Sequence, residues 1–321
     1  MPRPTSTTTT QRPDLGAIAY EYMLEADQRG FIADRILPIF DTPLQSAEYP
    51  KIPLEALLKI QDTKRAPRGD YNRSDYEFET GNYACAEYGW EEAVDDVEAN
   101  LYRRYFDAEE VATKRGVDIL LRGREVRVAA MIFNSGNFTV GNVSIEWSTA
   151  ATATPRANVT AGKQAMRAAS GLEPNVGACS KKVFENLFLT AEIKDAFKYT
   201  NPIEIGGLEM QKRLLATYFG LDEILVGGSM KDTAKKGQAF SLTDIWDDEY
   251  FGLYKVSGGG QELREPVVGR TFLWTGDSPQ MLVTEQYREE KKRSNIYRVR
   301  NNVAEAFIFQ GAGYLLGNIT A

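Results

Sequence analysis

The segment that most constrains the fold of this chain is residues 44–93. Prolines at positions 50, 53 and 67 exclude a long helix there, because proline has no backbone N–H group and its ring clashes with the preceding turn. From residue 74 to residue 90, side-chain types alternate at a period of two, as they do along a β-strand. We therefore predict a long two-stranded ribbon, with an outgoing strand in residues 48–60 and a returning strand in residues 74–90.

Three basic residues, Lys64, Arg65 and Arg68, lie where this ribbon must turn. They can form a contact patch for an acidic or phosphate-bearing partner, or the turn can be an ordinary solvated loop. An isolated two-stranded ribbon is only marginally stable in water. The ribbon is therefore expected to lie on another surface, either in its own chain or in a second chain.

The strongest helix pattern follows the ribbon, in residues 96–133. Asp95 and Glu98 have the spacing of a capping box, and apolar residues then recur every three or four positions. One continuous helix over this range would be about 57 Å long and would form a spine along one edge of a flat molecule. The alternative is two ordinary helices that meet near Gly116 or Gly123, since a glycine costs about 1 kcal/mol within a helix.

The remaining segments predict an α+β chain with two interwoven domains. Residues 1–13 are a proline- and threonine-rich tail, residues 14–35 a short arm with a helical turn, and residues 134–160 a polar, turn-rich stretch. Helices are predicted for residues 181–189, 191–199 and 208–219, and strands for residues 176–180, 223–227, 251–256, 269–274, 296–299 and 303–309. The last two strands are expected to return to the region of the long helix.

Histidine is absent from all 321 residues, which excludes many common catalytic and metal-binding arrangements. Ser-His-Asp and Cys-His catalysis, His-ligated zinc, copper and haem, and an imidazole pH switch all require that side chain. The two cysteines, Cys85 and Cys179, are too few for a four-thiolate metal site and can form at most one disulfide bond. We expect both thiols to be buried and unreactive, in a reducing compartment.

The remaining candidates for chemistry are weak. The glycines of residues 227–228 and 258–260 lack the spacing of a phosphate-binding loop. Asp247, Asp248 and Glu249 could bind a hard cation, but they lack the spacing and the glycine of a calcium loop. Adjacent acids elsewhere leave a carboxylate-based hydrolase as an alternative, if a cleft holds two of them about 5–10 Å apart. No catalytic constellation emerges, so we expect no enzyme activity, cofactor or metal.

Charge and hydropathy argue against two further classes. The formal net charge of −7 disfavours sequence-specific nucleic-acid binding, which needs a basic face. No run of about 18 apolar residues occurs, and the N-terminus lacks the apolar region of a signal peptide, so no membrane contact is expected.

The arm, the ribbon and the long helix are projecting elements that a monomer would not bury well. Copies that contact one another through different surfaces can close into rings, so an assembly subunit is favoured over an enzyme.

Several short strings occur in a particular order along the chain. They are Tyr83-Ala-Cys-Ala-Glu-Tyr88, Asp95-Asp96, Val128-Ala-Ala-Met-Ile-Phe133, Cys179-Ser-Lys-Lys-Val-Phe184, Glu223-Ile-Leu-Val-Gly227, Asp244-Ile-Trp246 and Leu263-Arg-Glu-Pro266. With the order of arm, ribbon, long helix, α/β region and returning strands, they resemble the tailed-bacteriophage major capsid proteins, which have the Hong Kong 97-type fold. The resemblance covers about residues 15–319 and rests on order and spacing together, since no string is a catalytic signature.

The resemblance implies an α+β fold with five regions. They are an N-terminal arm in residues 1–43, an extended β-ribbon loop in 44–93, a peripheral domain with the spine helix in 94–160, an α/β axial domain in 161–284, and C-terminal strands in 285–321 that return to the peripheral domain. By the family's layout, the ribbon would overlap a neighbouring subunit, and the axial domain would meet its copies at the centre of a capsomer. The arm would reach an adjacent subunit.

The implied function is structural and not catalytic. Many copies would form the hexamers and pentamers of an icosahedral shell, in the virion, around packaged double-stranded DNA that is bound without sequence specificity. Assembly in the host bacterial cytoplasm would involve a portal and a separate scaffolding protein, the latter because only some 14 residues precede the arm. Whether decoration proteins also bind the shell is left open by the sequence. A shell subunit of a cellular nanocompartment with the same fold is the alternative. Candidate contacts between subunits are Lys64, Arg65, Arg68, Asp247, Asp248 and Glu249.

Overall fold

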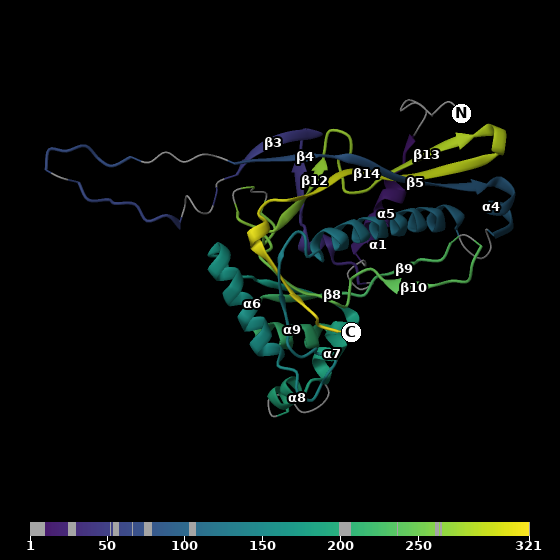
Figure 1. The fold of residues 1–321 in the computed structure, drawn as a ribbon. Helices are drawn as coiled ribbons and strands as arrows, with labels where there is room; N and C mark the ends of the chain where they lie inside the picture. Colours follow the sequence, from purple (N-terminus) through teal and green to yellow (C-terminus); the bar gives the residue numbers. More distant parts are fainter. Residues whose placement is uncertain are drawn as a thin grey trace.

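The chain forms a mixed α and β structure with three visibly different parts (Figure 1). An upper layer consists of a sheet with a long helix beneath it, a lower lobe holds shorter helices around a second sheet, and a thin ribbon projects far to one side. This computed structural model describes residues 10–24, 30–51, 53, 58–65, 67–73, 79–102, 107–198, 207–235, 237–260, 263 and 265–320.

A six-stranded sheet forms the upper layer. Its strands are β1 (Thr10–Gln11), β2 (Ile39–Thr42), β5 (Ala86–Asp95), β12 (Gly269–Trp274), β13 (Val283–Glu289) and β14 (Ser294–Phe307). The long strand β14 is central, because β13 and then β12 pair with it along one edge while β5 pairs along the other, all antiparallel. β2 adds to β12 in parallel, and β1 adds to β13. The two predicted C-terminal strands are therefore one continuous strand.

The long helix is shorter than predicted. α5 spans Ala108–Ile132, about 38 Å, and Asp107 caps it by accepting a hydrogen bond from the N–H group of Glu109. A separate helix, α4 (Asp96–Tyr102), precedes it, and Asp95 accepts a hydrogen bond from the N–H group of Val97 at the predicted cap. The prediction of one helix over residues 96–133 is therefore wrong, because Asp107 begins a new helix.

The predicted alternative, a break at Gly116 or Gly123, is also wrong, because α5 runs through both residues. At Gly116 the helix approaches β14 closely. A Cβ atom at this position would lie 3.0 Å from Cγ2 of Val299, which is tighter than ordinary contact. Gly116 thus lets the helix lie on the sheet, and this packing offsets the low helix propensity of glycine.

A five-stranded sheet forms the centre of the lower lobe, in the order β6–β15–β11–β7–β8. These strands are β6 (Thr139–Asn142), β7 (Val176–Ser180), β8 (Glu223–Gly227), β11 (Phe251–Tyr254) and β15 (Gly313–Gly317). All residues of β7 and β11 are buried, as expected for strands covered on both faces. β15 pairs here with β11 and β6, although we expected the C-terminal strands to return together to the region of the long helix.

Four helices accompany this sheet. They are α6 (Pro155–Ser170), α7 (Lys181–Leu189), α8 (Ala191–Phe197) and α9 (Leu208–Phe219). The last three agree with the predictions. α6 was missed, because part of it lies in a stretch taken as polar and turn-rich and only Val159 and Met166 are large buried apolar side chains along it. Its boundaries are nonetheless ordinary, with Pro155 at the start and Gly171 in a left-handed conformation at the end.

Two pairs of strands stand apart from the main sheets. β3 (Ser46–Lys51) and β4 (Glu79–Ala84) pair antiparallel, which confirms the predicted ribbon at its base. The paired strands are shorter than predicted, and parts of the expected strands, residues 52, 54–57 and 74–78, lie outside the described residues. The second pair, β9 (Met230–Asp232) and β10 (Leu242–Asp244), is a hairpin that the sequence did not predict.

The buried carboxylate of Glu125, on α5, joins the upper layer to the lower lobe. It accepts hydrogen bonds from the N–H groups of Ile32 and Ala33, at 2.7 and 3.1 Å, and from the indole of Trp246, at 2.7 Å. Ala33 begins the short helix α2 (Ala33–Ile36), and Trp246 belongs to the main core of the protein. Burial raises the pKa of Glu125 to about 7, even though these three donors favour the charged form.

Candidate inter-subunit surfaces

The base of the ribbon is fixed to the six-stranded sheet by aromatic side chains. Tyr83 stacks on Phe272 with ring centroids 4.2 Å apart, and Tyr49 packs against both rings. The hydroxyl groups of Tyr83 and Thr42 are 2.6 Å apart, and the hydroxyl of Tyr49 donates to the carbonyl of Phe307. Burial raises the pKa of Tyr49 to about 12, so this hydroxyl keeps its proton at neutral pH. The ribbon therefore leaves the body from a rigid base.

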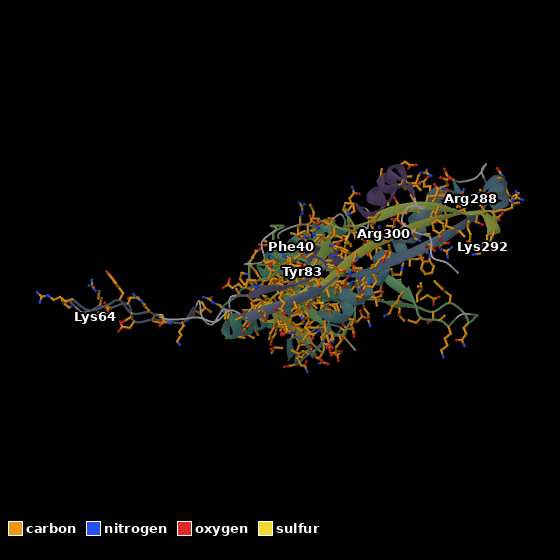
Figure 2. All side chains as sticks on the ribbon, turned by 90° about the horizontal axis from the view of Figure 1, so that it is seen from above. Phe40, Lys64, Tyr83, Arg288, Lys292 and Arg300 are labelled. Atoms are coloured by element: carbon orange, nitrogen blue, oxygen red, sulfur yellow. The ribbon has the colours of Figure 1, made fainter. Side chains whose placement is uncertain are left out.

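The ribbon turn, residues 58–65 and 67–73, begins beside the body of the molecule and then extends far from it. A Cβ atom at Gly171, at the end of α6, would lie 2.9 Å from Cδ1 of Leu58. Figure 2 shows Lys64 near the distant end, well separated from Tyr83 at the base. Every side chain of the described turn is exposed, and Ile60 is 96% exposed. A chain that exposes large apolar side chains on a thin projection has a surface suited to contact with a partner.

One of the predicted basic residues, Arg65, has its position set by contacts within the turn. Nε of Arg65 donates a 2.6 Å hydrogen bond to the carbonyl of Gly69, and the guanidinium lies 4.7 Å from the ring centroid of Tyr71. Arg68 has a left-handed backbone with φ of 68°. Within the part of the chain that the structure describes, Lys64, Arg65 and Arg68 form no ion pair with an acidic side chain. The positive charge of the turn is thus presented to solvent.

The predicted acidic residues lie elsewhere, in the lower lobe between β10 and β11, and contact their own chain. Asp248 accepts a 2.5 Å hydrogen bond from the hydroxyl of Ser180 and lies 3.4 Å from the ammonium of Lys182. Glu249 accepts a hydrogen bond from the N–H group of Asn318, and Asp247 accepts one from the N–H group of Glu249. The structure therefore does not bring these three acids together with the basic ribbon turn of the same chain.

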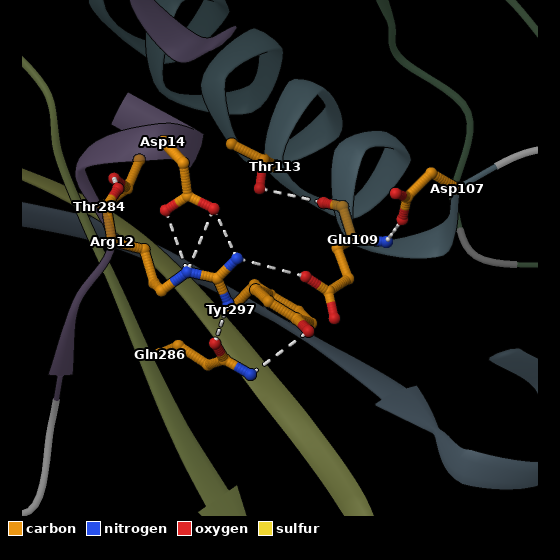
Figure 3. A network of polar contacts seen from close by, with 8 residues as sticks. All are labelled: Arg12, Asp14, Asp107, Glu109, Thr113, Thr284, Gln286 and Tyr297. Atoms are coloured by element: carbon orange, nitrogen blue, oxygen red, sulfur yellow. Dashed lines mark hydrogen bonds and ion pairs between the residues drawn. The ribbon is translucent and has the colours of Figure 1, made fainter. Parts of the chain in front are cut away.

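The described part of the arm packs on its own chain. α1 (Pro13–Leu24) lies against α5 and β13, although the resemblance implied that the arm would reach an adjacent subunit. Figure 3 shows the polar contacts that hold it: Arg12 donates to the carboxylate of Asp14 at 2.9 Å and reaches Glu109 at 3.4 Å. Arg12 also contacts Gln286, whose amide donates to the hydroxyl of Tyr297. The guanidinium of Arg12 lowers the pKa of Asp14 to about 2.

A ladder of ion pairs crosses the outer face of the six-stranded sheet, and sequence reasoning missed it. Arg298 contacts Glu91 at 2.6 Å and Glu285 at 3.1 Å, and Arg300 contacts Glu285 at 2.9 Å and Asp277 at 2.6 Å. The only signal in the sequence was the alternation of Arg298 and Arg300, since 207 positions separate Arg298 from Glu91. Such a charged face contrasts with the opposite face, which α5 covers.

The β9–β10 hairpin is a second projecting element with exposed apolar residues. Phe240 in its loop is 71% exposed, and Met230 and Leu242 on its strands are also exposed. The guanidinium of Arg122, on α5, donates to the carbonyl of Met230 and ties the hairpin to the long helix. In Figure 1 the hairpin lies below α5 and extends toward α4, on the side of the molecule away from the ribbon.

The prediction that both thiols are buried is confirmed. Cys85 and Cys179 form no disulfide bond with each other, and burial raises the pKa of each thiol. Among the described residues, no group of three or more acidic or cysteine side chains is placed to hold a metal ion. No described helix has both the length and the apolar character needed to cross a lipid bilayer.

Comparison with known sequences finds phage proteins similar to this chain. No protein-family model matches the chain. The sequence is 25% identical over 297 residues to the major capsid protein of Burkholderia phage BcepMu, covering 90% of this chain and 91% of that protein. It is 23% identical over 269 residues to the major capsid protein of Pseudomonas phage JBD67, covering 82% of each.

Solved structures share the fold. A phage-related protein from Bordetella bronchiseptica RB50 matches with a TM-score of 0.71 and 20% identity, covering 97% of this chain and 98% of that one. The capsid structure of Cyanophage P-SCSP1u matches with a TM-score of 0.56 and 11% identity, covering 88% of this chain and 86% of that one. The resemblance seen in the sequence is confirmed: this chain is similar to phage major capsid proteins over most of its length and has the Hong Kong 97-type fold of tailed-phage capsids.

Proposed function

We propose that this chain is the subunit of an icosahedral shell that encloses the double-stranded DNA of a tailed phage, with copies arranged in hexamers and pentamers. The role is structural, in line with the capsid proteins it resembles, and involves no catalysis. The shell is part of the virion and assembles in the host bacterial cytoplasm. A separate scaffolding protein, a portal and decoration proteins are the partners that this role requires or permits.

The observation that carries the proposal is the ribbon. Its base is rigidly packed, but beyond Leu58 its turn exposes apolar and basic side chains far from the body of its own chain. A two-stranded ribbon is marginal in water unless another surface supports it. Among the described residues, the ribbon meets its own chain at its base and near Leu58, so a neighbouring subunit is the natural support for the rest.

The arrangement favours rings over closed pairs. The ribbon lies at one end of the molecule, whereas the hairpin with Phe240 lies toward the other end. A contact between different surfaces of successive copies is heterologous and closes into a ring when the rotation between copies permits. We assign the five regions proposed from the sequence to such a capsomer, with residues 44–93 over a neighbour and residues 161–284 toward the centre.

The test is electron microscopy and sedimentation of the purified chain, alone and co-expressed with its genomic neighbours. Shells or rings of five and six copies are expected, with particles from phage-infected cells containing DNA. Particles that lack DNA and enclose a protein cargo would instead support the nanocompartment alternative. A stable monomer of 35.9 kDa under every condition would contradict the proposal and direct attention to hydrolysis by paired carboxylates.

A further inference from the structure

We propose that a groove at the free edge of β5 is the site that receives the basic ribbon turn of a second copy of this chain. The proposal rests on the shell function above and names the receiving surface within it. The groove is open and lies where β5 runs beside β14. It is lined by Glu87, Gly89, Trp90, Glu91, Arg298 and Arg300.

The first support is that this part of the sheet lacks a partner. Among the described residues, β5 pairs only with β14, so the other edge of its ten residues is open. The outer face is also uncovered by a helix. Val299 points toward α5, where it meets Gly116, and its neighbours Arg298 and Arg300 therefore point to the opposite face. Glu91 and Gly89 lie directly across from these two arginines and share that face.

The second support is the shape of the groove. Gly89 lies between Glu87 and Glu91 on the outer face and leaves a hollow beside Arg300. A Cβ atom at Gly89 would be 3.3 Å from Cβ of Arg300, so any side chain here would begin to fill the hollow. A glycine within a strand often marks a place where another chain segment approaches closely. Trp90, from the other face of β5, is 43% exposed and extends the groove with an aromatic surface.

The third support is charge. Strand β5 contains four acidic residues and no basic one. Arg298 and Arg300 in the groove are already paired with Glu285 and with other acids of the ladder. Glu87 is exposed, and its carboxylate forms no hydrogen bond or ion pair within the described residues. The groove therefore offers at least one free carboxylate beside an aromatic side chain, which suits an arginine.

The ribbon turn has the complementary chemistry and cannot reach the groove of its own chain. Figure 2 shows Lys64 and Arg300 widely separated along the molecule. Arg65 and Arg68 have no acidic partner among the described residues, and the packing of Arg65 on Tyr71 orders the turn before it binds. Each copy thus carries one basic projection and one groove with a free carboxylate. We therefore infer that the groove binds the ribbon turn of a second copy of this chain.

The experiment uses charge reversal in two full-length variants and follows shell formation by sedimentation and electron microscopy. The turn variant carries Arg65→Glu and Arg68→Glu, and the groove variant carries Glu87→Arg. Each alone is expected to lower the yield of shells about tenfold, because like charges then face each other at every contact. Glu98→Arg makes the same charge change on exposed α4, outside the groove, and is expected to leave the yield unchanged. Circular dichroism shows that each variant is folded.

The decisive arm is one chain that carries all three substitutions. The acidic turn of each copy can then meet the changed groove of the next copy in rings of five as well as of six, so this chain is expected to restore shells. Gly89→Leu, which fills the hollow without a charge change, is expected to reduce the yield and is not restored by adding the turn substitutions.

Three results would overturn the proposal while leaving the shell function intact. One is normal shells from the groove variant and from Gly89→Leu. A second is loss of shells from both charge variants with no recovery in the chain that carries all three substitutions. The third is a turn variant that forms normal shells with less packaged DNA, which would show that the turn contacts nucleic acid. Absence of shells from the unmodified chain would instead refute the proposed function itself.

Discussion

The lower lobe and the ribbon belong to one chain but obtain their stability in opposite ways. In the lower lobe, strands β7 and β11 are buried along their whole length, and Phe251 of β11 is fully buried. In the ribbon, only the base is packed, and the turn carries exposed apolar side chains such as Ile60. The lobe can fold from its own residues, whereas the ribbon has the sequence of a segment that is completed by a neighbour. Stability of the subunit and stability of the assembly are therefore encoded in different places.

The largest effect on the subunit is expected from the lower lobe. Phe251→Ala would remove a ring that packs edge-on against Trp147, with centroids 5.2 Å apart, and is expected to lower the free energy of unfolding by about 3–5 kcal/mol. Tyr71→Ala, at a ribbon residue that is 72% exposed, is expected to change it by less than about 0.5 kcal/mol. Urea unfolding of unassembled subunits measures both. An equal loss of unfolding free energy in the two variants would contradict the conclusion that the lobe, and not the ribbon, stabilises the subunit.

The junction between the two layers is expected to respond to pH. The pKa of Glu125 is about 7 in the folded chain against an ordinary value of 4.5, so the folded state holds this proton more tightly. The contribution of Glu125 to the free energy of unfolding is greatest below pH 4.5. It falls by about 3 kcal/mol in total as the pH rises from 4.5 through 7. Urea unfolding across this range measures it.

Glu125→Gln is the matched variant, since it keeps the shape of the side chain and removes its titration. The fall in stability between pH 4.5 and 7 is expected to be smaller in this variant than in the unmodified chain. Its overall stability also drops, because the amide nitrogen would face N–H donors that now contact the carboxylate. An unchanged pH profile would show that the buried carboxylate is not the titrating group.

A smaller effect is expected where the arm joins the body. Arg12→Met removes the contacts with Asp14 and Glu109 and is expected to destabilise the docked arm by about 1 kcal/mol, since partly exposed ion pairs contribute little each. Hydrogen exchange of residues 10–24 should become several-fold faster. Lys114→Met, which removes a helix-surface pair on α5, is the control and should leave that exchange unchanged.

The smallest effect is expected at residues 258–260. These three glycines are exposed, and a Cβ atom at any of them would meet nothing within 4 Å. Insertion of a few glycine and serine residues there should leave both the unfolding midpoint and the yield of shells unchanged. Loss of folding would show that this loop is part of the lobe's packing.

The sequence predicted the lobe's strands and helices better than it predicted the surfaces. Runs such as residues 223–227 are short, apolar and bounded by glycine or a charged residue, so local pattern is enough. The ladder at Arg298 joins residues that are far apart in the chain, and no local pattern records such a pairing. α6 was missed because its buried face is built partly from small residues, including Gly162, which lies against Leu253.

The candidate site divides in the same way. The basic charge of the ribbon turn was visible in the sequence, because Lys64, Arg65 and Arg68 are close together. The groove at Gly89 was not visible in the sequence, because it forms only where β5 pairs with β14. It stays open because α5 covers the opposite face of the sheet. The acids at 247–249 were singled out for their density, and the structure shows two of them, Asp248 and Glu249, contacting their own lobe instead.

The most direct test of the division between lobe and ribbon is a chain without the ribbon turn. Lys51 and Glu79 are paired at the base, so a two-residue Asn-Gly turn can replace residues 52–78. Sedimentation velocity and thermal unfolding of this chain are compared with those of the unmodified protein. We predict an unchanged unfolding midpoint and no shells. Shells of normal size, or a subunit that no longer folds, would contradict the conclusion that the ribbon serves the assembly and the lobe serves the subunit.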